Sequence, residues 1–476
     1  MTSLISTLLA LLTMGAAGFG ATMWVMRGAA RLRIFEILAL SWFLGTVLVS
    51  LSLWGLSFFI KGQWLLLGMA ILCGALGIVG FSLARTRLAN FELSQPRNLM
   101  EWVLTALLFF EIAAISWITF KHTLGWDGLL IWELKARLAF LNGGALPAGY
   151  FTDNGRAYSH PEYPLYLPLT EMWLYLCIGQ CHQFLAKVIF PIFYFTGMIL
   201  LVRAGAELSG RLWIGLSIAV LFPLIPLATH FPGIVVGYVD VPLSFLYLAA
   251  IYYLLIFTRE GSREALVLFI IMASGLPWMK REGAILWPIL AVLGAMFIFR
   301  RHGLRVAGLS LLPGISIIAA WLIFLRSMHV PHSRDFVPVS FHVLWANLSR
   351  LDPVLCSLID DLSRPSYWSL FWYATAFALI CIVFRSRSTG AAILGTCILV
   401  PIGLYCATYL FSAWPDLVAH VESSLPRLLL QLVPAGWLAI ALAIAPVPRR
   451  NSSTIRMRGP LEPRPSARSE SGTDCN

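Results

Sequence analysis

Charged residues are scarce in this chain. Asp, Glu, Lys and Arg make up 12% of the 476 residues, whereas 59% are hydrophobic. This composition excludes a soluble globular protein and favours a helical protein that crosses a membrane several times. The formal net charge of +11 would suggest nucleic-acid binding in a soluble domain. Because most Arg residues lie in short loops between apolar runs, where they set orientation, we expect no nucleic-acid partner.

Motifs for metal binding are also missing. Most of the eight Cys residues lie within or beside apolar runs, which is typical of small buried side chains. Cys177 and Cys181 are four residues apart, but His182 does not complete a metal-site spacing with them. The three His residues of the segment 326–366 (His329, His332 and His342) are irregularly spaced. We expect neither a metal site nor a cofactor.

The apolar runs predict 13 transmembrane helices. The predicted spans are 4–26, 34–60, 64–84, 99–120, 184–202, 212–230, 239–257, 264–278, 283–299, 306–325, 367–384, 391–411 and 428–446. Placing the Arg-rich loops in the cytoplasm puts the N-terminus outside and the C-terminus inside. The sequence thus predicts an all-α polytopic protein of the cytoplasmic membrane, embedded in a lipid bilayer. It has one membrane domain, 1–447, and a disordered basic cytoplasmic tail, 448–476.

The apolar segment 162–181 does not fit this alternation. A full crossing there would reverse the orientation of every later loop and place Arg-rich loops outside. Pro161, Pro164 and Pro168 interrupt the entry into the segment. We therefore expect a juxtamembrane or partly inserted helix packed at the outer face.

Polar side chains that are costly to bury collect on the predicted outer side. The candidate site residues are Asp127, Glu133, His160, Glu162, Asp240, Lys280, Arg281, Glu282, His420 and Arg427. A merely structural membrane protein has no reason to sort its charges in this way. An enzyme with its active site at the outer face does.

The outer loop 121–161 holds the first candidates. Residues 126–141 predict an amphipathic interfacial helix, with Glu133 paired to Arg137 at i,i+4. Its apolar stripe would consist of Leu130, Leu134, Leu138 and Leu141. Asp127 either caps this helix or acts as a general base. The loop ends in HPEYP, which either presents His160 and Glu162 above the bilayer or only turns the chain.

Three later segments carry the other candidates. Asp240, in VGYVDVPL, caps a helix or serves the site. The tip at residues 280–282 separates two apolar stretches and is expected to dip into the membrane, where Lys280 and Arg281 suit a phosphate. Arg427 is predicted to open a span directly after Pro426, as a second phosphate contact or as a snorkelling side chain. Residues 326–366 predict a substrate-covering loop with a short interfacial helix.

These motifs, taken in order, resemble bacterial integral-membrane glycosyltransferases of the type C (GT-C) fold, related to the protein O-mannosyltransferase and aminoarabinose transferase group. The motifs are the Asp-bearing outer loop, HPEYP, GYVDVPL, KREG and HVESSLPRLLLQL. The resemblance covers roughly residues 100–440. The chain departs from the family in lacking a second acid beside Asp127 and in placing four spans before that loop. The outer C-terminal domain of some branches is also missing.

The resemblance implies that the chain is a glycosyltransferase. It would move a sugar, with inversion, from a polyprenyl-phosphate donor to an extracytoplasmic lipid, glycan or protein acceptor. Asp127 would take the proton of the acceptor hydroxyl, and Lys280 and Arg427, with Arg281, would hold the donor phosphate. His160 matches the family's His-Pro element. The residues themselves leave open a flippase or secondary transporter for a lipid-linked saccharide, and a structural scaffold.

Overall fold

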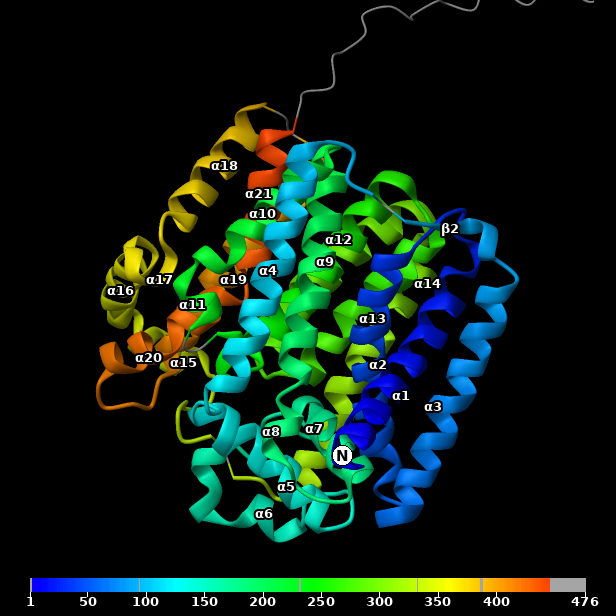
Figure 1. Ribbon diagram of the computed structural model, residues 1–476. Coiled ribbons are helices and arrows are strands. Elements are labelled where there is room, and N and C mark those ends of the chain that lie inside the picture. The colour runs from blue at the N-terminus through cyan, green and yellow to red at the C-terminus, as the bar shows by residue number, and fades with distance from the viewer. Residues whose placement is uncertain (1, 94, 231–232, 332, 386–387, 446–476) are drawn as a thin grey trace, which may run out of the picture. The chain divides into compact units, whose positions relative to one another are not determined.

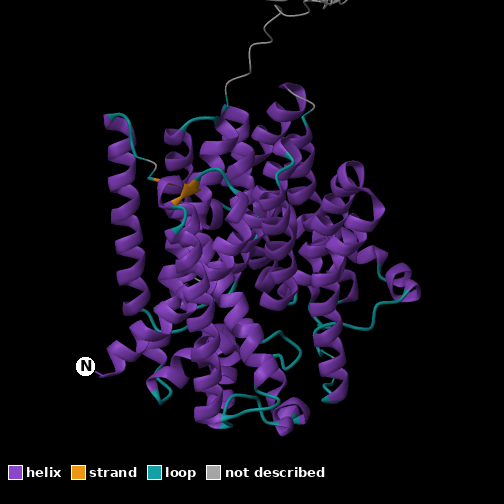
Figure 2. Ribbon diagram, turned by 90° about the vertical axis from the view of Figure 1, so that its right-hand side faces the viewer, coloured by secondary structure: helices purple, strands orange, loops and turns teal. Residues whose placement is uncertain are grey.

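The chain is described by a computed structural model that covers residues 2–93, 95–230, 233–331, 333–385 and 388–445. The predicted tail 448–476 and His332 lie outside these residues. The compact unit Met1–Ala445 is built almost entirely from α-helices (Figures 1 and 2). In the described ranges, the strands β1 (Leu32–Arg33) and β2 (Phe91–Glu92) form one short parallel pair. The expected all-α class is therefore confirmed.

Long helices form the body of this unit. They are α1 (Thr2–Val25), α2 (Ile34–Leu56), α3 (Gly62–Arg85), α4 (Leu99–Lys121), α9 (Ile189–Ser209), α12 (Asp240–Glu260), α13 (Arg263–Met279), α14 (Gly283–Ser327), α18 (Phe371–Arg385) and α19 (Thr389–Thr408). Eight helices of the described chain are long and apolar enough to cross a bilayer, or ten when two bent helix pairs are each counted as one span. The chain is thus a helical membrane protein, and the count of 13 spans stays a prediction.

The longest helix, α14, folds back on itself. Its 45 residues would extend about 68 Å if straight, against a hydrocarbon core of about 30 Å. Gly303 interrupts it with φ 81° and ψ 175°, between the predicted spans 283–299 and 306–325. A Cβ added at Gly314 would meet the Trp287 ring at 2.3 Å, so the two halves pack against each other.

Short elements gather at one end of the unit, which we call the loop end. They include α5 (Leu134–Leu141), α6 (Ala148–Thr152), α7 (Tyr166–Ile178) and α8 (Gln183–Ala186), and the N-terminus lies beside them (Figure 1). Helix α7 has 13 residues, about 20 Å, so it is too short to cross a bilayer. It packs against α1, α2 and α5, and the Trp173 indole donates to the Ala10 carbonyl at 3.1 Å. The segment 162–181 thus holds a short helix packed at the loop end, and its partial insertion in the membrane stays a prediction.

The remaining short elements connect the long helices. They are α10 (Leu212–Leu221), α11 (Pro226–Thr229), α15 (Phe341–Ala346), α16 (Leu351–Ser363), α17 (Pro365–Trp368), α20 (Leu417–Leu430) and α21 (Val433–Ile444), with 3-10 turns that include η4 (Asn154–Ser159) and η6 (Ile234–Val236). The segment 326–366 was expected to hold one short interfacial helix. The structure places α15, α16 and the start of α17 there, so the segment is more helical than expected.

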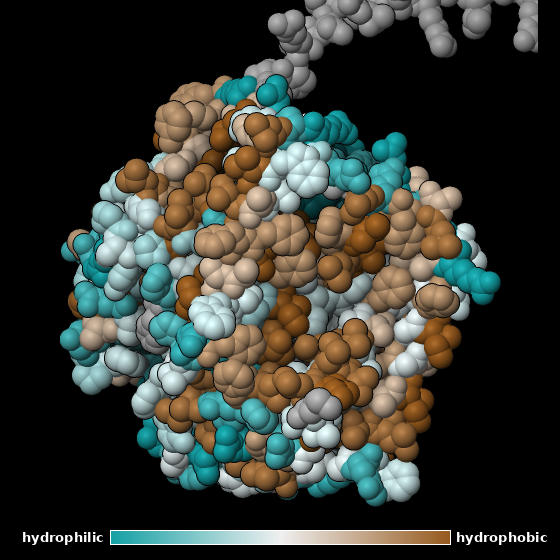
Figure 3. All heavy atoms as spheres, in the orientation of Figure 1, coloured by the Kyte–Doolittle hydropathy of each residue, from teal (hydrophilic) through white to brown (hydrophobic). Residues whose placement is uncertain are grey.

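The surface of the unit has the polarity that a bilayer requires. Figure 3 shows hydrophobic side chains across the middle of the visible face and more hydrophilic ones towards both ends. Large apolar side chains such as Ile71 on α3 and Phe110 on α4 are 63% and 72% exposed. Because a soluble protein rarely exposes so much continuous apolar surface, this face fits a lipid environment.

The predicted amphipathic helix at 126–141 differs from the structure. Residues Gly128–Glu133 form a π-helix, labelled η3, which continues directly into α5. The buried face carries Trp132 and Lys135, while Leu141, the last member of the predicted leucine stripe, is 70% exposed. The wider π turn shifts the register of the helix. The predicted leucine stripe is therefore not the buried face of the segment, and its position on a membrane surface stays a prediction.

Candidate functional site

A cavity of about 640 Å³ opens at the loop end of the helices. Its lining includes six of the ten predicted site residues, namely Asp127, His160, Arg281, Glu282, His420 and Arg427. They come from segments up to 300 residues apart in the sequence. Aromatic side chains complete the lining and include Trp126, Tyr163, Phe336, Tyr405, Tyr409 and Trp414. Such a mixture of apolar wall and few polar groups is typical of a ligand site.

Arg427 joins the polar side chains at one end of this cavity. Its Nη2 donates to the Asp127 carboxylate and to Asp240 Oδ2 at 3.2 Å, and its Cζ lies 4.9 Å from the centre of the Tyr238 ring. The prediction that a span begins at Arg427 is wrong. Helix α20 begins ten residues earlier, at Leu417, and the chain bends by 48° between α20 and α21.

The backbone around Asp127 is fixed by the segment that precedes α12. The Gly125 amide donates to the Val236 carbonyl at 2.8 Å, and the Asp127 amide donates to the Tyr238 hydroxyl at 3.2 Å. The Asp127 side chain makes no capping hydrogen bond to the helix that follows. It points instead to Arg427, so capping does not account for this carboxylate.

Gly128 allows the close approach on which this placement depends. A Cβ added at Gly128 would lie 2.6 Å from the Val236 carbonyl oxygen. We expect Gly128→Ala to reduce the free energy of unfolding by about 1–3 kcal/mol, because the backbone must shift to relieve the overlap. Thermal unfolding of the purified protein measures this effect. The matched control is Gly149→Ala in α6, where an added Cβ meets nothing within 4 Å; equal melting temperatures for the two variants would contradict the expectation.

A buried charge network lies behind Arg427. Asp240 Oδ1 accepts hydrogen bonds from Lys280 Nζ at 2.7 Å and from Gln431 Nε2 at 2.9 Å. Lys280 Nζ also lies 2.9 Å from Glu282 Oε1. Asp240 and Lys280 are 0% and 1% exposed, and neither lines the cavity. Lys280 is therefore placed to hold Asp240 rather than to touch a phosphate, and Asp240 holds Arg427 rather than capping α12.

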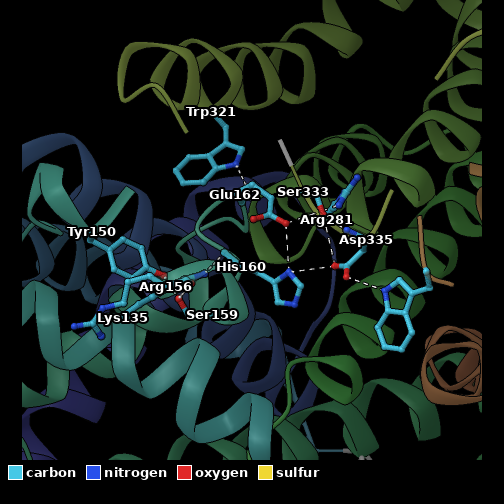
Figure 4. A network of polar contacts seen from close by, with 11 residues as sticks. Lys135, Tyr150, Arg156, Ser159, His160, Glu162, Arg281, Trp321, Ser333 and Asp335 are labelled. Carbon is cyan, nitrogen blue, oxygen red and sulfur yellow. Dashed lines mark hydrogen bonds and ion pairs between the residues drawn. The ribbon is translucent and has the colours of Figure 1, made fainter. Parts of the chain in front are cut away.

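A second polar cluster surrounds His160 (Figure 4). His160 Nδ1 lies 3.3 Å from Glu162 Oε1 and 3.7 Å from Asp335 Oδ2. Arg281 Nη1 lies 3.9 Å from the same Glu162 oxygen. His160 has a φ of 49°, which is uncommon for a residue other than glycine. Lys135 Nζ holds this turn by donating to the His160 carbonyl at 2.7 Å.

Burial dominates the ionisation of Lys135. It lowers the pKa of this ammonium group from 10.5 to about 7, although the Glu162 and Asp127 carboxylates act in the opposite direction. Burial would raise the pKa of Glu162, but the His160 imidazole and the Lys135 ammonium lower it below its ordinary value. The two groups are therefore coupled through the His160 turn.

This lowered pKa predicts a stability that depends on pH. Above pH 7 the folded protein holds Lys135 neutral, whereas the unfolded chain keeps it protonated up to about pH 10.4. Because the unfolded state binds more protons in that window, stability should rise with pH, by at most about 1.4 kcal/mol per pH unit. Thermal unfolding between pH 7 and 9 should show a smaller slope for Lys135→Met than for the wild type. Parallel slopes would contradict the expectation.

Glu133 lies apart from both clusters. It is 2% exposed, pairs with Arg137 at 2.9 Å and accepts from the Tyr175 hydroxyl at 3.0 Å. The expected i,i+4 pair is thus confirmed. These partners belong to α5 and α7, and Glu133 does not line the cavity, so its position does not favour contact with a substrate.

His420 lies in an aromatic part of the cavity wall. Its ring is stacked on Trp414, with centroids 4.6 Å apart, and its Nδ1 lies 2.7 Å from Ser412 Oγ. The adjacent covering segment, residues 333–339, is joined to this wall. Val337 donates its amide to the Phe411 carbonyl at 2.8 Å. The segment therefore lines the cavity, and the expectation that the loop 326–366 covers a substrate stays a prediction.

The sequence analysis missed three polar residues of the site. Asp335 lies in the covering segment and accepts from the Trp414 indole at 3.0 Å. Tyr238 contacts the Asp127 backbone, and Gln431 contacts Asp240. Gln431 follows Arg427 by four residues, a spacing that places two side chains on one helix face. That spacing could have identified Gln431, whereas nothing comparable singled out Asp335.

Comparisons with known proteins do not assign this site. Within the described ranges, no group of three or more His, Cys, Asp or Glu side chains is arranged to hold a metal ion. No protein-family model, curated protein or solved structure matches the chain.

Proposed function

We propose that this chain is an inverting glycosyltransferase that moves a sugar from a polyprenyl-phosphate donor to an extracytoplasmic acceptor. The observation that carries this proposal is the position of Arg427. It lines the cavity beside Asp127, and its buried Nε has no hydrogen-bond partner among the described residues. A buried, unsatisfied cationic donor suits an anionic ligand, and the carboxylate beside it suits a second substrate that has to lose a proton.

Two guanidinium groups would bind the donor phosphate. Arg427 offers its free Nε, and the Arg281 side chain is 44% exposed and lines the same cavity. Arginine suits phosphate because its donors form a planar fork. Lys280, which the resemblance implied as a phosphate contact, would instead position Arg427 through Asp240. With Lys280 holding Asp240, the Arg427 and Arg281 side chains would both be left to bind the phosphate in the cavity.

Asp127 would act as the general base. The acceptor hydroxyl transfers its proton to the Asp127 carboxylate while its oxygen attacks the anomeric carbon. The bond between that carbon and the phosphate oxygen breaks, and the prenyl phosphate leaves with the bonding electron pair. Arg427 stays on the phosphate while this bond breaks, so that its charge stabilises the leaving group where little water is present.

The membrane arrangement that we propose keeps 13 spans. Seven of the spans would be α1, α2, α3, α4, α9, α12 and α19. The other six would be the two halves of α14, the two bent helix pairs, α13 and α18. This set gives the alternation predicted from the Arg-rich loops. The cavity would then face the outer side of the cytoplasmic membrane, where a lipid-borne donor and an aqueous acceptor meet. A GT-C-like arrangement of the membrane helices belongs to the same proposal.

Transfer in detergent solution tests this function. Purified protein is incubated with radiolabelled prenyl-phosphate sugars and a panel of glycan, lipid and peptide acceptors, and labelled products and free prenyl phosphate are measured. We expect equal amounts of glycosylated acceptor and prenyl phosphate. A flippase or secondary transporter binds its lipid-linked cargo but leaves the sugar–phosphate bond intact. Donor binding without bond cleavage across the panel would therefore overturn the proposal in favour of a transporter.

A further inference from the structure

A second cavity, of about 260 Å³, adjoins the first at the loop end. It is lined by the turn η4 and by Val330, Pro331, Ser333, Arg334 and Asp335. The two cavities share three lining residues, His160, Ser333 and Asp335. Figure 4 shows the His160 ring between Glu162 and Asp335. The side chains of His160, Ser333 and Asp335 therefore form the wall between the two cavities.

Carboxylates outnumber guanidinium groups in the polar lining of this second cavity, although Arg156 lies 3.6 Å from Asp153 and Arg281 lies 3.9 Å from Glu162. The carboxylates of the lining belong to Asp153, Glu162 and Asp335, and Arg334 supplies the one guanidinium group among the described lining residues. The Tyr158 ring is 43% exposed and adds an aromatic surface. Carboxylates accept bonds from hydroxyl and ammonium groups and repel anions. The lining thus favours a neutral or cationic polyhydroxylated group.

The wall between the cavities is held in one arrangement. The His160 ring stacks on Tyr163, with centroids 4.5 Å apart, and Asp335 is fixed by the Trp414 indole. The left-handed backbone of His160 is maintained by Lys135. Strained backbone of this kind persists where the surroundings determine it, often at ligand sites. A group in the second cavity would therefore meet a preformed surface.

We infer that this second cavity is the acceptor subsite, and that it takes a neutral or amine-bearing sugar unit rather than an anionic one. The inference rests on the proposed transferase function. A volume of 260 Å³ holds about nine water molecules, which is the scale of one sugar ring. An acceptor seated there would lie beside the cavity that contains Asp127, with His160, Ser333 and Asp335 at the border of the two.

Binding of three small probes tests the charge preference. Saturation-transfer NMR on the purified full-length protein measures the binding of methyl glucosaminide, methyl glucoside and methyl glucuronide. We expect saturation transfer to the first two and at least about tenfold weaker binding of the glucuronide, because its carboxylate faces three others. No transfer to any probe, or equal binding of the glucuronide, would overturn the assignment.

A plug variant tests the location. Ala157 lines the second cavity, so Ala157→Trp fills it and should weaken binding of the glucoside by about tenfold or more. The matched control is Ala148→Trp at the exposed start of α6, outside the lining, which should bind as the wild type does. Unchanged binding in Ala157→Trp would overturn the subsite.

One further readout separates this inference from the proposed function. Cleavage of the prenyl-phosphate sugar in water, without acceptor, is measured for the same preparations. We expect cleavage within about twofold of the wild type in Ala157→Trp, since the donor cavity is unaltered. Cleavage lost together with sugar binding would contradict a separate acceptor subsite. Failure of the wild type to cleave any donor would instead remove the transferase proposal.

Discussion

Asp127→Asn is expected to lower the rate of sugar transfer by about 100- to 10,000-fold, the range that a general base contributes. The amide cannot accept the proton of the acceptor hydroxyl, but its oxygen can still accept a hydrogen bond from Arg427, so the position of Arg427 should persist. Donor binding should therefore remain within about threefold of the wild type. Single-turnover transfer from a radiolabelled prenyl-phosphate sugar measures the rate of the chemical step. Equilibrium binding of the same sugar measures the affinity for the donor.

Asp352→Asn provides the matched control for this variant. Asp352 is an exposed carboxylate in α16 and does not line the cavity, so its amide variant should transfer sugar as the wild type does. Full activity of Asp127→Asn would keep the class of reaction but remove Asp127 from its centre. Equal losses in both variants would show that the assay reports a general effect of lost charge.

Lys280→Met is expected to destabilise the protein by about 3–5 kcal/mol, because the buried Asp240 carboxylate loses its closest cationic partner and keeps only Arg427 and Gln431. Lys280 is 1% exposed and pairs with Asp240 and Glu282 at 2.7 and 2.9 Å. Methionine retains most of the volume of the side chain and removes its charge and its hydrogen-bond donors. The melting temperature and the denaturant midpoint of purified protein measure the loss.

The exposed ion pair between Arg31 and Glu92 supplies the control for this effect. Its side chains are 71% and 44% exposed, and such pairs contribute about 0–1 kcal/mol. Arg31→Met should therefore leave the melting temperature almost unchanged. If Lys280→Met is as stable as Arg31→Met, the network around Asp240 does not hold the site together, and the positioning role assigned to Lys280 is wrong.

The long apolar runs allowed several helices to be predicted closely. The predicted span 99–120 corresponds to α4 (Leu99–Lys121), and 239–257 corresponds to α12 (Asp240–Glu260). Polar or turn-forming residues bound both runs, so hydropathy alone locates their ends. Helix α20 was missed because its sequence, LVAHVESSLPRLLL, alternates polar and apolar residues. A search for continuous apolar runs does not detect such an amphipathic helix.

The membership of the site was easier to predict than its pairing. Costly charges in the predicted outer loops identified Asp127, Asp240, Lys280 and Arg427 as candidates, because membrane proteins retain such groups only for a reason. The sequence does not reveal that Arg427 contacts Asp127, since 300 residues separate them and only helix packing brings them together. For the same reason the sequence could not show that Lys280 lies behind the cavity wall.

A structure of the purified protein at saturating prenyl-phosphate sugar tests the central claim most directly. The account predicts the phosphate in the 640 Å³ cavity, with an oxygen about 3 Å from Arg427 Nε and the anomeric carbon facing Asp127. A third, apolar cavity of about 390 Å³ lies among α2, α4, α9 and α10. Donor bound there, with the cavity beside Arg427 empty, would contradict the account.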